Sequence, residues 1–210
     1  MPILEEEEDN KKKVSRLILA SSSPRRKRIL KQLKIDFEVF HPEEVTEEVF
    51  RDPRRTVVYN SSRKAQFVYN HVIINNLNCA DSAVAGFDTV VYFKGRNVAK
   101  PADVLQAECS LMQLSGRSHL VLTGIALIDI NTGRMVTGIE ATRVKFRKLA
   151  ITEIRDYLEN EDILDKAGAY DISGYGCILV EKIKGCFYNV AGLPVNKLIE
   201  LAGKLNYRIL

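Results

Sequence analysis

A cluster of cations that follows a serine-rich turn is the segment best suited to bind an anion. A short apolar run ends at Ala20, and the chain continues Ser21-Ser22-Ser23-Pro24-Arg25-Arg26-Lys27-Arg28. Cations have the wrong sign for the first turn of a helix, yet the free N–H groups there bind anions. Arginine adds bidentate recognition of oxygen atoms. We therefore predict a phosphate site that uses Arg25 and Arg26, with Lys27 and Arg28 facing solvent; the alternative is a solvated basic patch.

A second candidate is an acidic residue inside an apolar strand. Asp88 interrupts the run 83–93, and a buried carboxylate is costly unless it meets a cation or a metal. A turn at 94–97 folds the chain back and brings Lys100 within reach by one diagonal step. Asp88 and Lys100 therefore form either a simple ion pair or, together with a metal, a surface that faces phosphate.

Two further segments could contribute to such a site. Lys64 has helical spacing to Val57 and Val68 and so shares their apolar stripe. Its side chain either extends past the core to solvent or points into a polar site. Residues 165–176 contain three glycines and a serine before a strand, which allows close approach of backbone to a ligand but also fits an ordinary loop.

These residues need a framework, and hydrophobic periodicity supplies one. Long hairpins occur together with helical crossovers, so we predict an α/β domain with a mixed, twisted sheet and flanking helices. Ser23 is a natural N-cap with Pro24 as first helical residue, and Asp103 caps a later helix. Strands are expected at 17–20, 37–40, 83–93, 119–130, 134–146 and 177–183, and helices at 24–34, 56–77, 104–115, 152–159 and 194–204.

Length and composition indicate one domain. The 210 residues are 46% hydrophobic and 28% charged, enough to bury a sizeable core. Five acids and three lysines crowd residues 1–13, so we expect a disordered tail there and a single domain over 14–210. Four cysteines without a C-x-x-C pair indicate reduced thiols rather than a zinc or redox motif.

Composition also limits the partners. The chain has 31 Lys and Arg against 27 Asp and Glu, an excess that fits an anionic ligand but is too mild to indicate nucleic-acid binding. No apolar run is long enough to span a membrane, and the acidic N-terminus differs from a secretory leader. We expect a cytoplasmic protein with neither a membrane nor a nucleic-acid partner.

A series of ordered motifs over residues 16–205 resembles the Maf family of nucleoside triphosphate pyrophosphatases. The opening stretch, from Leu19 to Arg26, is followed by five more motifs: 86–91, 100–101, 114–119, 165–170 and 189–194. The resemblance implies hydrolysis of a nucleoside triphosphate to the monophosphate and pyrophosphate, assisted by Mg²⁺ or Mn²⁺. It also implies a fold related to the inosine-triphosphate pyrophosphatases, with two lobes around a cleft, and allows a homodimer.

The resemblance also assigns roles to individual residues. The family's catalytic aspartate falls on Asp88 and its lysines on Lys64 and Lys100. Its phosphate-binding serine and arginines fall on Ser21, Arg25 and Arg26. An acidic residue after the second strand completes the site: Glu47 is the better match and Glu44 the second. Asp88 and Glu47 would hold the metal, because Mg²⁺ prefers oxygen ligands.

Base preference is implied by three positions. Arg25 and Thr89 match the relatives that act on dTTP and UTP, whereas Ser173 stands where that group has glutamine and the 7-methyl-GTP group has glutamate. Phe87 replaces the usual alanine before the aspartate. We expect dTTP and UTP as substrates; the alternatives are a modified nucleotide such as 7-methyl-GTP and a nucleotide-binding protein without turnover.

Overall fold

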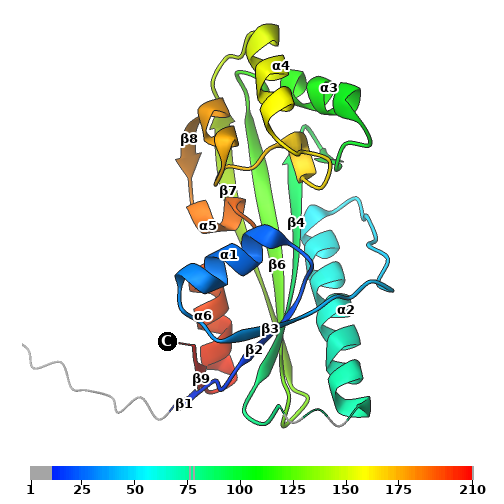
Figure 1. The fold of residues 1–210 in the computed structure, drawn as a ribbon, viewed down its shortest axis with the longest axis vertical. Coiled ribbons are helices and arrows are strands. Elements are labelled where there is room, and N and C mark those ends of the chain that lie inside the picture. Colours follow the sequence, from blue (N-terminus) through cyan, green and yellow to red (C-terminus); the bar gives the residue numbers. More distant parts are fainter. Residues whose placement is uncertain (1–10, 76, 78, 210) are drawn as a thin grey trace, which may run out of the picture.

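The computed structural model describes residues 11–75, 77 and 79–209 and shows a mixed seven-stranded sheet (Figure 1). Its strands run in the order β3-β2-β4-β6-β7-β8, and β5 pairs with β4. β2 is parallel to β3 and β4, and the other pairs are antiparallel. The expected mixed α/β sheet is confirmed. The bounds are β2 Leu17–Ala20, β3 Phe37–Phe40, β4 Ala83–Phe93, β5 Arg96–Val98, β6 Ser118–Asp129, β7 Met135–Phe146 and β8 Val180–Lys184.

Helices cover both faces of this sheet. Along β2, Ile18 packs in the cluster that contains Val68 of α2, whereas Leu19 packs in the cluster that contains Leu30 of α1. α3 and α4 gather at the far end of the long strands (Figure 1). The bounds are α1 Pro24–Gln32, α2 Pro53–Ile74, α3 Val104–Leu114, α4 Ile151–Asn160, α5 Phe187–Val190 and α6 Val195–Lys204, with 3₁₀ turns η1 Ala167–Ala169 and η2 Tyr175–Leu179.

The predicted helix boundaries hold to within a few residues. α1 stops before Lys34, which adopts a left-handed φ of 55°, so the helix cannot continue to that residue. α2 begins three residues before the prediction because Asp52 accepts a hydrogen bond from the N–H of Arg54 at 2.9 Å. Asp103 caps α3 as predicted, accepting from the N–H of Gln106.

Two predicted segments differ from the structure. Residues 175–179 form η2 rather than the start of a strand, so β8 begins only at Val180. Residues 1–10 of the predicted tail 1–13 lie outside the described residues. Within the remainder, β1 (Lys12–Lys13) pairs with β9 (Tyr207–Arg208). Lys12 and Lys13, which the prediction counts as part of the tail, therefore belong to a short strand pair. Backbone pairing needs no apolar side chains, and the lysines remain exposed.

Close contact between α2 and the sheet fixes the position of the helix. Gly86 on β4 and Gly124 on β6 lie under α2, where an added Cβ would overlap the backbone oxygens of Ser61 and Val57. Only glycine permits this approach. Gly86 lies two residues before Asp88 and so on the same face of β4. Gly124 is the residue of β6 that pairs with Asp88. α2 therefore lies directly beside Asp88. Across the described part of the chain, no helix could cross a membrane.

Candidate active site

The site forms where one edge of β4 lacks a neighbouring strand. β2 pairs with residues 83–86 and β5 with residues 91–93, which leaves 87–90 without a strand on that edge among the described residues. Successive side chains of a strand point to opposite faces, so Asp88 and Thr89 approach the gap from opposite sides of the sheet.

A cavity of about 620 Å³ opens at this gap. Its walls come from both halves of the molecule: the β2–α1 turn and α2 on one side, and the segment around η1 on the other. The cavity therefore corresponds to the expected cleft between two lobes. Among its lining residues are eight of the nine predicted site residues: Ser21, Arg25, Arg26, Glu47, Lys64, Asp88, Thr89 and Lys100.

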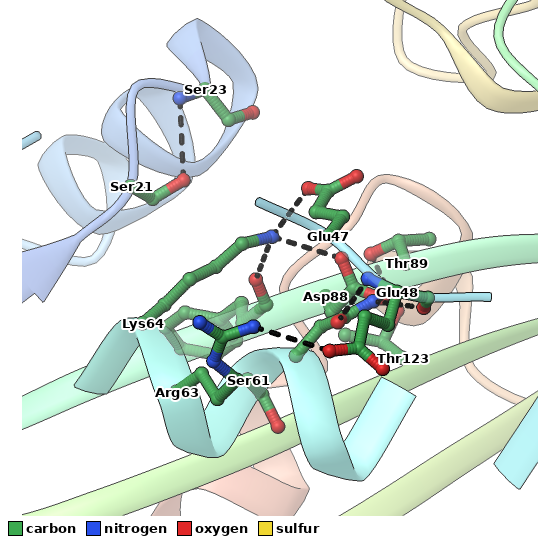
Figure 2. Close-up of polar contacts among 12 residues, drawn as sticks. Ser21, Ser23, Glu47, Glu48, Ser61, Arg63, Lys64, Asp88, Thr89 and Thr123 are labelled. Atoms are coloured by element: carbon green, nitrogen blue, oxygen red, sulfur yellow. Dashed lines mark hydrogen bonds and ion pairs between the residues drawn. The ribbon is translucent and has the colours of Figure 1, made fainter. Parts of the chain in front are cut away.

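Lys64 joins the two acidic residues of the site (Figure 2). Its Nζ donates to Asp88 Oδ1 at 2.9 Å, to Glu47 Oε1 at 2.6 Å and to the carbonyl of Phe87 at 3.4 Å. Lys64 is 8% exposed and Asp88 5%, so both charges are largely removed from water. Of the two alternatives for Lys64, the structure shows the polar site.

Lys100 does not form the ion pair with Asp88 that the hairpin predicts. Its Nζ lies 3.8 Å from Glu47 Oε2 instead. β5 ends at Val98, so Lys100 lies beyond the paired segment. The position next to Asp88 is occupied by Lys64 of α2. Lys100 is half-exposed and lines the cavity, where its charge faces any ligand that enters.

Glu47 contributes the second carboxylate of the cavity. Partial burial disfavours its charged form, but the neighbouring Lys64 ammonium outweighs burial and holds the pKa of Glu47 below its ordinary value. The carboxylate is therefore ionised at neutral pH. Glu44, the other sequence candidate, lines a separate cavity of about 280 Å³ beside Phe67 and His71, so the geometry favours Glu47.

Arg26 is buried and binds three parts of the chain. Its Nε donates to the carbonyl of Gly192 at 2.8 Å, and its two terminal nitrogens donate to Ser21 Oγ at 2.8 Å and Thr89 Oγ1 at 3.1 Å. The guanidinium lies 5.4 Å from the ring centre of Phe87. Burial lowers its pKa to about 10, so it stays charged at neutral pH. Its main role is to hold the turn that shapes the anion site.

The first turn of α1 faces the cavity. The helix begins at Pro24 as predicted, but the Ser23 side chain forms no capping bond; instead Ser21 Oγ accepts from the N–H of Ser23 at 3.2 Å. Ser23 is therefore the N-cap residue as predicted, but its side chain does not cap the helix. Arg25, half-buried beside the turn, also lines the cavity. A helix start with an adjacent arginine is suited to oxyanions.

Two residues that support the site, Thr123 and Asn60, escaped the sequence analysis. Thr123 Oγ1 lies 3.0 Å from Thr89 Oγ1 and donates to the carbonyl of Asn189 at 3.3 Å. On the opposite face, Asn60 Nδ2 donates to Asp88 Oδ2 at 3.2 Å. Thr123 could be found only once the β4–β6 register was known. Asn60 lies four residues before Lys64, and this helical spacing was an available signal.

Ser173 is the one predicted site residue that the structure does not bring to the cavity. It is exposed, and its N–H and hydroxyl both donate to Asp171 Oδ1, at 2.9 and 2.6 Å. Of the glycine-rich segment, Asp165, Ala167 and Tyr170 line the cavity.

The donor set at Asp88 and Glu47 fits a hard divalent cation. Within the residues that the structure describes, no group of three or more His, Cys, Asp or Glu side chains could hold a metal. A closed protein cage is therefore absent there. Mg²⁺ is commonly held by one or two carboxylates together with substrate phosphates and water, and two carboxylates beside an anion site match that arrangement.

Comparison with known proteins identifies relatives along most of the chain. A dTTP/UTP pyrophosphatase of Caldicellulosiruptor saccharolyticus is 35% identical over 189 residues, covering 89% of this chain and 93% of the relative. A dTTP/UTP pyrophosphatase of Acetivibrio thermocellus is 41% identical over 180 residues, covering 85% and 89%.

Among solved structures, a nucleoside-triphosphatase / dITP/XTP pyrophosphatase from Mycobacterium abscessus overlaps 62% of this chain and 72% of its own, at 18% identity and a TM-score of 0.35. With so low a TM-score, this overlap is not used to assign the chain to a family. The model of the family described as "Maf: Maf-like protein" matches residues 16–205. Together with the identities to the two pyrophosphatases, this match shows that the chain belongs to the Maf-like protein family.

Proposed function

We propose that the protein hydrolyses nucleoside triphosphates, dTTP and UTP foremost, to the monophosphate and pyrophosphate. The observation that carries the proposal is a buried carboxylate, Asp88, held by Lys64 at the edge of a cavity lined by further cations. The names of the relatives at 35–41% identity support the same reaction.

Cations on two sides of the cavity would bind the triphosphate. Arg25 stands at the start of α1, and Lys100 lies across the cavity beside Glu47. Arg26 already donates to three protein acceptors, so it contributes mainly charge and the shape of the turn. Charge-assisted contacts to phosphate oxygens are the strongest hydrogen bonds available for this purpose.

Asp88 would be the group that acts on water. Attack of a water oxygen on the α-phosphorus breaks the bond to the bridging oxygen, pyrophosphate leaves with that oxygen, and a proton passes from water to the Asp88 carboxylate. Lys64 would keep this carboxylate oriented through its hydrogen bond to Oδ1. With Asp88 and Glu47 as ligands, bound Mg²⁺ or Mn²⁺ would supply charge neutralisation at the phosphate oxygens.

Base preference rests on fewer contacts. Arg25 and Thr89 match the pyrimidine-selective relatives, but the Ser173 hydroxyl is bonded to Asp171 and lies outside the cavity lining. A site that hydrogen-bonds a base discriminates steeply, whereas pocket size discriminates weakly. We therefore propose a preference for dTTP and UTP that is looser than in relatives with glutamine.

Pyrophosphate release over UTP, dTTP, CTP, GTP and 7-methyl-GTP tests both parts of the proposal. The highest kcat/KM is expected for UTP and dTTP. Equal values for all five would overturn the base preference alone. Binding without turnover of any nucleotide would overturn the activity and favour a nucleotide-binding protein.

A further inference from the structure

The loop between β3 and α2 is held by side chains of α2. Residues 41–50 contain neither helix nor strand, so their backbone groups need other partners. Thr56 Oγ1 accepts from the N–H of Phe50 at 3.0 Å. Asn60 binds Glu48 twice: its Oδ1 accepts from the Glu48 N–H at 2.9 Å, and its Nδ2 donates to the Glu48 carbonyl at 3.0 Å.

Asn60 differs from Thr56 because it also contacts the proposed catalytic carboxylate. Its Nδ2 donates to Asp88 Oδ2 at 3.2 Å, while Lys64 Nζ donates to Asp88 Oδ1 at 2.9 Å. Both oxygens of Asp88 are therefore fixed by residues of the same helix, four positions apart. Asn60 is only 1% exposed, and one amide group joins β4, α2 and the loop that carries Glu47.

We propose that Asn60 is a positioning residue that fixes the orientation of the Asp88 carboxylate and its separation from the loop with Glu47. This inference rests on the proposed function. Without the amide, Asp88 keeps the hydrogen bond from Lys64 but loses the one to Oδ2, so the carboxylate can rotate. The loop also loses both of its backbone hydrogen bonds at Glu48, the residue after Glu47. Misplacement of a reacting group by about 1 Å can cost on the order of 100-fold in rate.

The effect should fall on kcat rather than on KM. The cations proposed to bind the triphosphate, Arg25 and Lys100, have no hydrogen bond to Asn60 in the described structure, so substrate capture should persist. If Asn60 only ordered the loop, its loss would instead lower kcat and raise KM together.

The test compares Asn60→Leu with a matched control, Thr56→Val. Leucine keeps the branched shape of asparagine, with a somewhat larger volume, and lacks its hydrogen bonds. Valine keeps the shape of Thr56, removes its bonds to the same loop and leaves Asp88 untouched. Thr56 is also 1% exposed, so the two sites are equally buried. kcat and KM for UTP are measured with saturating Mg²⁺, and thermal unfolding reports folding.

We expect Asn60→Leu to lower kcat by about 10- to 100-fold with KM changed by less than about threefold, and Thr56→Val to stay within about twofold of the parent in kcat. Should Asn60→Leu fail to fold, Asn60→Ser, which keeps a polar group too short to bridge Glu48 and Asp88, is expected to show the same fall in kcat.

Three outcomes contradict the inference. Equal losses in the Asn60 and Thr56 variants, with KM raised in both, would assign Asn60 to loop order alone. An active parent with an unchanged Asn60→Leu kcat would overturn the role of Asn60 and leave the proposed function intact. A parent that turns over none of the five nucleotides would overturn the proposed function and this role together.

Discussion

The buried histidine behind the cavity wall should make stability depend on pH. His119 is 2% exposed, its Nε2 lies 2.8 Å from the Tyr170 hydroxyl, and it packs against the ring of Phe146. Burial lowers its pKa from 6.5 to about 4. The folded protein therefore holds this ring neutral where the unfolded chain would protonate it.

The sign and size of the effect follow from linkage. Between about pH 6.5 and pH 4 the unfolded chain binds the extra proton and the folded chain does not, so acidification favours unfolding. The stability is complete above the unfolded pKa and is lost as pH falls towards the folded value. At about 1.4 kcal/mol per pKa unit, the His119 pKa difference corresponds to about 3 kcal/mol.

Urea unfolding of the parent and of His119→Gln, followed at several pH values from about 7 to about 4, measures this contribution. The glutamine amide can keep a hydrogen bond to the Tyr170 hydroxyl but does not titrate. Carboxylates titrate in both proteins and largely cancel in the difference. The parent should lose about 3 kcal/mol more than the variant on acidification. Parallel curves would refute the assignment of a buried neutral histidine.

Three other substitutions probe the site and its support. Asp88→Asn should lower pyrophosphate release by at least about 100-fold with an unchanged circular dichroism spectrum; near-parental turnover would show that Asp88 is not the base. Arg25→Ala should lower kcat/KM at least about tenfold through loss of a charge-assisted contact, whereas the exposed Arg28→Ala should not. Gly124→Ala should lower the free energy of unfolding by about 1–3 kcal/mol because the new Cβ would meet the α2 backbone. The control, Gly203→Ala, has space for a Cβ in α6 and should raise the free energy of unfolding by up to about 1 kcal/mol. Equal shifts in melting temperature for the two variants would contradict this packing.

Some of the site could be predicted because a single segment carried the signal. Asp88 was conspicuous as an acid in an apolar strand, and the bounds of β4 agree with the prediction. Lys64 was conspicuous on an apolar helical stripe. In both cases burial of a charge in a periodic pattern was visible locally, and burial demands a partner.

The partners themselves were not predictable from local pattern. Asp88 pairs with Lys64 rather than Lys100 because two glycines on different strands allow α2 to approach the sheet. Arg26 has acceptors at positions 21, 89 and 192, which only the tertiary structure brings together. The family resemblance alone indicated Ser173, whose hydroxyl donates to Asp171 and which is not among the residues that line the cavity.

The long strands also limit how the cleft can move. β4 and β6 run without interruption from the half that contains α2 to the half that contains α3 and α4 (Figure 1). The two halves share these strands, which pair continuously from Ala83–Asp129 to Tyr92–Leu120. Narrowing of the cleft around a bound molecule would therefore require the sheet itself to bend or twist. Small-angle scattering profiles with and without nucleotide should therefore nearly superimpose.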